Sequence, residues 1–236
     1  RLAEDPVLAM VVGYNEQEFG FLRPQSTQAL PAWRAFLKRR YGTIDALRRA
    51  WGKRAEKIRA WEEIPLYKAE LSSFNDADFA EFVLENEREI MRFYRKELDK
   101  MGFRGPLSGF NLLGTKQSLL LRREFDYVSK NSYETLMSNY FNPGSILSQD
   151  SSISSLAKLF RTTVGTRLAG KPFFVTEYGI PFWNRYRYEV AFTMGAFAAF
   201  QRYDGVAAFG DSYARRKISI IQPVRIFQDP IGVAAE

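Results

Sequence analysis

The stretch Lys171–Gly179, KPFFVTEYG, decides the fold class of this chain. The residues before Glu177 are apolar or β-branched, as is typical of a buried strand, and the acidic side chain follows them directly. The segment Pro6–Tyr14, PVLAMVVGY, follows the same plan and leads into Asn15–Glu16. Apolar strands that end in polar residues are typical of parallel α/β folds, whose sites lie at the carboxyl ends of the strands.

Helical segments alternate with strands of this kind. Apolar side chains at three- and four-residue spacing predict a long helix after Asn75 that Gly102 ends, and Thr43 and Gly52 bound a short helix. We predict strands at 6–14, 105–111, 125–129, 173–176 and 206–209, and helices at 31–41, 44–51, 76–101, 151–168 and 190–201. The sequence thus predicts about five βα units.

The composition excludes several kinds of catalytic and metal site. The 236 residues include no cysteine and no histidine, which excludes disulfides, thiolate nucleophiles, catalytic triads with histidine and the common zinc sites. The formal charge is +7, but the basic clusters lie in apolar-periodic helices, which favours solvated helix faces over a nucleic-acid surface. No window of about 18 apolar residues predicts a membrane span. Proton transfer would fall to Asp, Glu, Lys or Tyr, without cofactor or metal.

Two carboxylates at strand ends, Glu16 and Glu177, fit one reaction that survives these exclusions. Glycoside hydrolysis uses a pair of carboxyl groups across the glycosidic bond, one as proton donor and one as nucleophile or base. The other interpretation of each residue is a helix cap or an ion-pair partner. The occurrence of both, one after Asn15 and one before Tyr178–Gly179, favours the catalytic pair.

The order of these segments resembles a known group of enzymes. Val12–Glu16, VGYNE, and Val175–Gly179, VTEYG, resemble the fourth- and seventh-strand segments of the clan A glycoside hydrolases. Between them, Trp33–Trp51, WRAFLKRRYGTIDALRRAW, and Asp126–Ser129 with Tyr133 beyond it are similar to the family 42 β-galactosidases. The resemblance covers nearly the whole chain.

The resemblance implies a retaining (β/α)8 TIM barrel that cleaves a β-galactoside or a related sugar, with Glu16 as acid/base and Glu177 as nucleophile. It makes the first strand here the fourth of the barrel. Residues 1–236 would then form a single catalytic barrel domain that lacks its first three strands. Because an open parallel sheet is a poor stand-alone fold, we expect the rest of the barrel from a longer chain or a second chain.

Other residues are candidates for carbohydrate contacts. The expected substrate-binding residues are Asn15, Asn111, Tyr133, Tyr178 and Trp183.

Two features of the sequence depart from the family pattern. Glu18 would point the same way as Glu16 in an extended strand, which makes it a rival acid/base. The last strand ends in Phe209 where the clan often has a tryptophan, which puts the substrate in doubt more than the reaction.

Two other functions remain open. A protein of the same fold can bind or organise carbohydrate without turnover, because fold does not dictate function. A basic nucleic-acid-binding module is the third possibility, and salt-dependent retention on DNA would identify it.

Overall fold

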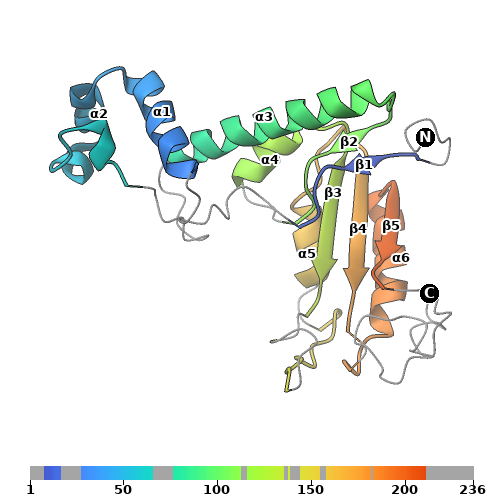
Figure 1. Cartoon of the computed structure of the whole chain (residues 1–236). Helices are drawn as coiled ribbons and strands as arrows, with labels where there is room; N and C mark the ends of the chain where they lie inside the picture. Colours follow the sequence, from blue (N-terminus) through green and yellow to red (C-terminus); the bar gives the residue numbers. More distant parts are fainter. Residues whose placement is uncertain are drawn as a thin grey trace. The chain divides into compact units, whose positions relative to one another are not determined.

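A computed structural model shows the fold of residues 8–16, 28–65, 77–112, 116–135, 138, 144–154, 158–181 and 183–210 (Figure 1). The chain divides into two compact units. The first unit joins Arg1–Gln17 to Leu98–Glu236, and the second is Glu18–Glu97. The second unit is therefore an insertion between two parts of the first along the sequence.

The first unit contains parallel strands in sequence order. They are β1 (Val11–Val12), β2 (Leu107–Ser108), β3 (Val128–Tyr133), β4 (Phe173–Gly179) and β5 (Gly205–Ala208). β1 pairs with β2, and β3, β4 and β5 form a second parallel ladder. Asp126, just before β3, links the two ladders, since Leu107 donates to its carboxylate at 2.9 Å and accepts from its backbone at 3.1 Å. The fold is mixed α/β with parallel strands, as the sequence predicts, and no closed barrel is present among the described residues.

Helices follow the strands of this unit. They are α4 (Lys116–Arg122), α5 (Lys158–Val164) and α6 (Glu189–Gln201). The core between the β3–β5 ladder and the helices α5 and α6 consists of Val128, Leu159, Phe160, Phe173, Val175, Tyr178, Val190 and Met194. In Figure 1, α5 and α6 lie beside the ladder of β3, β4 and β5. α6 is apolar on every face, and its Phe192 and Phe200 are exposed.

The second unit is helical. It contains α1 (Ala29–Tyr41), α2 (Ile44–Trp51), the 3₁₀ turns Gly52–Ala55 and Trp61–Glu63, and most of α3 (Ala77–Lys100). The predicted cap of α2 is confirmed, because the Thr43 hydroxyl accepts from the backbone N–H of Ala46 at 3.2 Å. Gly52 ends that helix at φ 57°, a conformation that favours glycine.

A buried carboxylate organises the second unit. Asp78, at the start of α3, accepts hydrogen bonds from Tyr41 at 2.7 Å and from the Trp51 indole at 2.6 Å. Arg40 forms an ion pair with it at 2.8 Å. The Trp33 ring lies at the centre of the neighbouring apolar core, stacked on Phe36. The single carboxylate thus joins α1, α2 and α3.

The element boundaries correct several sequence predictions. The strand expected at 125–129 runs from Val128 to Tyr133, because the buried polar residues that continue it satisfy their hydrogen bonds inside the protein. The helix α4 was missed. The segment expected as a helix from Ser151 begins with turns, where Ser151 accepts from the backbone of Ser154. Val11 and Val12 are only half-buried, since β1 has a single neighbour among the described strands.

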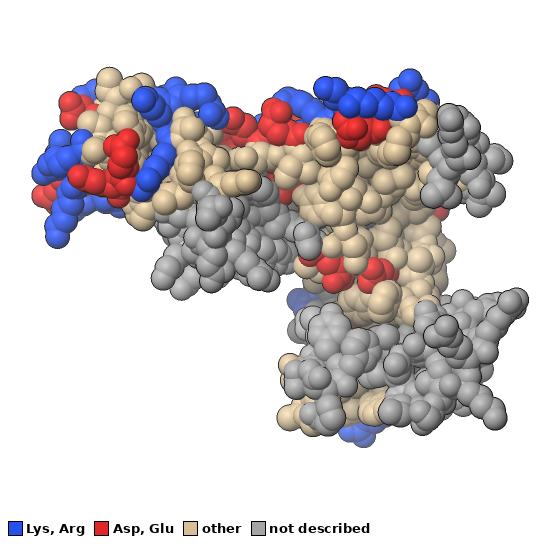
Figure 2. Space-filling model, in the orientation of Figure 1, with Lys and Arg blue, Asp and Glu red and all other residues tan. Residues whose placement is uncertain are grey.

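Lysine and arginine side chains gather over α1 and α2 (Figure 2). Several of them are paired, for example Arg39 with Glu85 and Arg40 with Glu81. The part of the chain that the structure describes contains no helix long and apolar enough to cross a membrane.

Candidate active site

Polar side chains meet at the carboxyl ends of the parallel strands. Asn15 and Glu16 follow β1, and Asn111 follows β2. Parallel strands bring their carboxyl ends to the same edge of a sheet, so residues far apart in sequence become neighbours there. Two further members, Asn131 on β3 and Glu177 on β4, complete the group.

Glu16 has an unusual backbone conformation. Its φ is 52°, in the left-handed region that non-glycine residues seldom adopt. Such a conformation costs about 1–3 kcal/mol and is typically kept where function requires it. The Glu16 N–H donates to Oδ1 of Asn111 at 2.8 Å, which holds this turn in place. The extended geometry that placed Glu16 and Glu18 on the same side therefore does not hold at Glu16, while Glu18 lies outside the described residues.

Hydrogen bonds between asparagine side chains connect the strand ends. The amide nitrogen of Asn111 donates to Oδ1 of Asn15 at 2.9 Å. The amide nitrogen of Asn131 donates to the same oxygen at 3.3 Å and to Oε1 of Glu16 at 3.0 Å. The carbonyl oxygen of Asn131 accepts from the Thr176 hydroxyl at 2.7 Å. Glu16 is thus held by its backbone to β2 and by its side chain to β3.

Glu177 lies on the neighbouring strand β4. Tyr133 donates its hydroxyl proton to Oε2 of Glu177 at 2.5 Å. Burial raises the pKa of Glu177 above its ordinary value, the hydrogen bond from Tyr133 opposes this rise, and the charge of Glu16 adds to it. Hydrogen bonds from Asn131 and Asn15 also lower it. Asn131 therefore interacts with both carboxyl groups.

This arrangement can perform acid–base and nucleophilic chemistry. It consists of two carboxyl groups close enough to influence each other, one phenol and several amides. Neutral amides and a phenol can orient carboxylates without pairing their charge, which leaves the oxygens free to react. Within the described ranges, no group of three or more acidic side chains is placed to ligate a metal ion.

The predicted substrate-binding residues differ in their exposure and in their contacts with the carboxyl pair. Asn15 is exposed beside the carboxyl pair, and Tyr133 contacts Glu177. Asn111 is 3% exposed and holds Glu16 and Asn15, so its position is that of a support instead of a sugar contact. Tyr178 is 5% exposed and belongs to the apolar core, which corrects its expected place in the site. Trp183 is exposed in the turns after β4, and its carbonyl accepts from Gln149.

A β-bulge in β4 explains why Glu177 faces the site and Tyr178 faces the core, the reverse of what an unbroken strand would give. In the pairing of β3 with β4, Lys130 faces Val175 and Asn131 faces Glu177, so Thr176 is an extra residue. Without the bulge, Glu177 would share a face with the buried Val175. The extra residue moves Glu177 to the face of the site and turns Tyr178 into the core.

Sequence reasoning missed the roles of Asn131 and Thr176. The signal that could have found them is the polar composition of β3, VSKNSY, in which five consecutive residues are buried. Polar side chains in a buried strand need internal partners, and such networks are often functional. The Phe209 ring after β5 lies edge-on to the Tyr133 ring at 5.9 Å, so this aromatic residue borders the same group.

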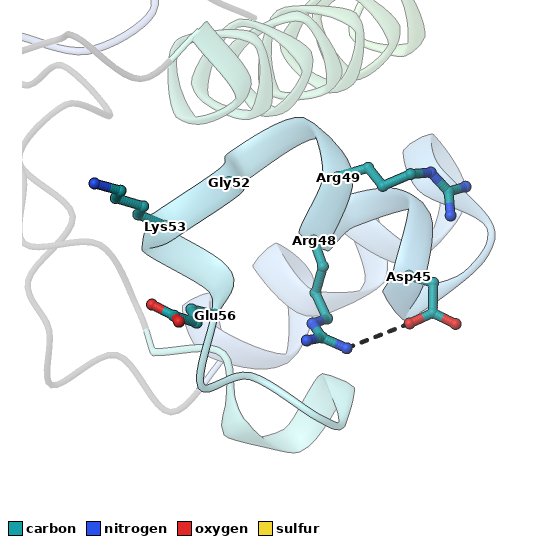
Figure 3. A pocket seen from close by; sticks show the side chains of 6 residues that line it. All are labelled: Asp45, Arg48, Arg49, Gly52, Lys53 and Glu56. Atoms are coloured by element: carbon teal, nitrogen blue, oxygen red, sulfur yellow. Dashed lines mark ion pairs between the residues drawn. The ribbon is translucent and has the colours of Figure 1, made fainter.

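Apart from this site, a hollow with a volume of about 500 Å³ lies on the helical unit, next to α2. Arg48, Arg49, Lys53, Asp45 and Glu56 line it together with Gly52. Figure 3 shows that the Arg49 and Lys53 side chains point in different directions, while Arg48 turns toward Asp45 at 3.5 Å. The cations do not converge on a common point, so this hollow lacks the geometry of an anion site.

Comparisons with known proteins bear on the family and the fold of this chain. A model of glycoside hydrolase family 42, described as β-galactosidase, matches residues 1–191. The crystal structure of a β-galactosidase from the psychrophilic Marinomonas ef1 matches 88% of this chain with a TM-score of 0.55 and 17% sequence identity. The match covers 35% of that protein, so the chain spans about a third of its length.

Proposed function

The chain belongs to glycoside hydrolase family 42, and on this premise we propose that it carries the catalytic pair of a retaining glycoside hydrolase. Glu16 is the acid/base and Glu177 is the nucleophile. The substrate is a β-galactoside or a related β-linked sugar. The observation that carries the proposal is the position of one side chain, Asn131, which donates to Glu16 and lies opposite Glu177 in the pairing of β3 with β4.

The reaction proceeds by double displacement. The Glu177 carboxylate attacks the anomeric carbon and forms a glycosyl ester, while the bond from this carbon to the leaving oxygen breaks and Glu16 gives its proton to that oxygen. Glu16 then removes a proton from water, whose oxygen bonds to the anomeric carbon while the ester bond to Glu177 breaks, and the sugar leaves with its original configuration. The Tyr133 hydroxyl orients Glu177 for attack.

Contacts with the sugar come from side chains that border the carboxyl pair. The exposed amide of Asn15 is placed to hydrogen-bond a sugar hydroxyl next to the reacting carbon. Tyr133 and Phe209 offer aromatic surface on the β3 and β5 side. We assign a further stacking role to Trp183, which is exposed in the turns after β4. A glycosidic substrate needs both kinds of contact, because pyranose rings have polar edges and apolar faces.

We further propose that this part is the later portion of a TIM barrel, with three more βα units from a longer chain or a second chain. Two features support this. Among the described strands, β5 pairs only with β4 and β1 pairs only with β2, which leaves an outer edge on each. The outer side chains Phe192, Phe200 and Val206 are exposed, as expected of a surface that further units cover.

Chemical rescue of a Glu177→Ala variant tests the function on the protein in its native form. The substitution removes the nucleophile and leaves room for a small anion, so turnover of an aryl β-galactoside should be lost, and azide should restore it as a glycosyl azide of inverted configuration. Glu124→Ala, which removes an exposed carboxylate of the same unit, is the matched control and should keep full activity. Near-native activity of Glu177→Ala would refute the assignment. Sugar binding without turnover by the native protein would favour a non-catalytic carbohydrate-binding function.

A further inference from the structure

One hydrogen bond determines which side-chain atoms donate and which accept throughout the asparagine network. A backbone N–H can only donate, and the N–H of Glu16 faces the Asn111 side chain at 2.8 Å, so that atom must be the carbonyl oxygen. The amide nitrogen of Asn111 therefore faces Asn15 at 2.9 Å and the Thr176 hydroxyl at 3.4 Å. Each later bond in the network takes its direction from this first one.

The Thr176 hydroxyl passes this direction to Asn131. It accepts from Asn111, so its proton is free to point elsewhere, and it donates to Oδ1 of Asn131 at 2.7 Å. With its oxygen held there, the amide of Asn131 turns its nitrogen to Oε1 of Glu16 at 3.0 Å. A flipped amide would place an oxygen against the Glu16 carboxylate, and two acceptors facing each other repel.

We propose that Thr176 is a positioning residue, which sets the orientation of the Asn131 amide and so directs its N–H groups at the carboxyl pair. The β-bulge places Glu177 on the same side of the strand as Thr176. In an unbroken strand, neighbouring residues point to opposite faces, yet Thr176 and Glu177 both interact with Asn131. The extra residue in β4 brings the hydroxyl and the nucleophile to the same side. This role rests on the proposed function of Glu16 and Glu177.

Variants at Thr176 separate the hydroxyl from the shape of the side chain. Thr176→Val keeps the branched shape but leaves Asn131 without its donor, and we expect kcat/KM for a glycoside with a poor leaving group to fall about ten- to a hundredfold. Thr176→Ser restores the hydroxyl and should recover most of this loss. Thr193→Val is the control, because that half-buried hydroxyl donates only within helix α6, to Glu189 and Val190.

A double-mutant cycle tests whether Thr176 acts through Asn131. In an Asn131→Ala background there is no amide to orient, so Thr176→Val should lower kcat/KM by less than about twofold. Equal losses in both backgrounds would show that Thr176 acts by another route and would overturn the proposal.

Neutron diffraction gives a readout that does not depend on turnover. The side-chain deuterons of Asn131 should face Glu16 in the wild-type protein and in Thr176→Ser, and the amide should rotate in Thr176→Val. An unchanged amide in Thr176→Val would refute the inference even in an inactive protein. A native protein without glycosidase activity would refute the proposed function instead, and the amide orientations would still decide the role of Thr176.

Discussion

The hydroxyl of Tyr133 donates a hydrogen bond of 2.5 Å to Oε2 of Glu177, which joins the ends of strands β3 and β4. A phenol in this place stabilises the ionised carboxylate that burial and the charge of Glu16 disfavour. The nucleophile of the proposed reaction thus depends on a donor from the adjacent strand.

Replacement of Tyr133 by phenylalanine should make the reaction more sensitive to acid. Without the hydrogen bond, the already raised pKa of Glu177 rises further, so the acid limb of the pH profile of kcat/KM moves to higher pH. A hydrogen bond to a charged group contributes about 1.5–3 kcal/mol, which corresponds to a rate loss of about ten- to a hundredfold. Tyr203→Phe, whose hydroxyl donates to Thr163, is the control. An unmoved acid limb in Tyr133→Phe would contradict the role of the phenol.

Removal of the Glu177 charge should stabilise the protein at neutral pH. A carboxyl group whose folded pKa is raised contributes its stability below the unfolded value, about 4.3, and loses it as pH rises through the folded value. Glu177→Gln should therefore have a higher Tm than wild type at pH 7. The difference should shrink as the pH falls toward 4. Thermal denaturation across this range measures the effect, and a Tm difference that grows on acidification would disprove it.

The dependence of the reaction rate on the leaving group identifies the acid/base residue. A proton donor matters most for poor leaving groups, so Glu16→Ala should slow unactivated galactosides far more than dinitrophenyl galactosides. Glu18→Ala should have a smaller effect without this dependence. Steady-state kinetics of both variants on both substrate types decides between the two residues. The reverse pattern would transfer the role to Glu18.

The stability of the helical unit should depend on Asp78. Asp78→Ala leaves the half-buried donors of Tyr41 and Trp51 without their acceptor, at a cost of up to about 1–3 kcal/mol for each donor. Glu81→Ala removes an exposed ion pair with Arg40 and should cost less than about 1 kcal/mol. Urea unfolding measures both changes. Similar losses for the two variants would show that the buried carboxylate does not organise this unit.

The distance between the two carboxyl groups predicts the stereochemical outcome. We expect a separation of about 5–5.5 Å between Glu16 and Glu177 in a sugar complex, the spacing of retaining enzymes. A crystal structure with a bound inhibitor gives the distance directly, and NMR of the first product gives its configuration. A separation of about 8 Å with an inverted product would replace double displacement by a single displacement.

Local sequence patterns were sufficient to predict much of the fold and the placement of Glu16 and Glu177 after apolar strands. The spacing of apolar residues predicted α3, and Thr43 and Gly52 marked the ends of α2. These features depend on contacts within a few residues, which the sequence displays directly. Strand β3 was misplaced by several residues, because its buried serine, lysine and asparagine side chains have partners on other strands and helices.

The sequence by itself determined that Glu16 and Glu177 follow apolar strands, and parallel pairing then brings them to one edge of the sheet. Only the tertiary structure decided which neighbours join them. An extra residue in β4, visible only from its pairing with β3, turns Tyr178 into the core and brings Glu177 to the side where Thr176 contacts Asn131. The side-chain alternation of a strand has a period of two residues, so a single inserted residue reverses every later assignment. The register that reveals this insertion arises from hydrogen bonds between strands more than forty residues apart.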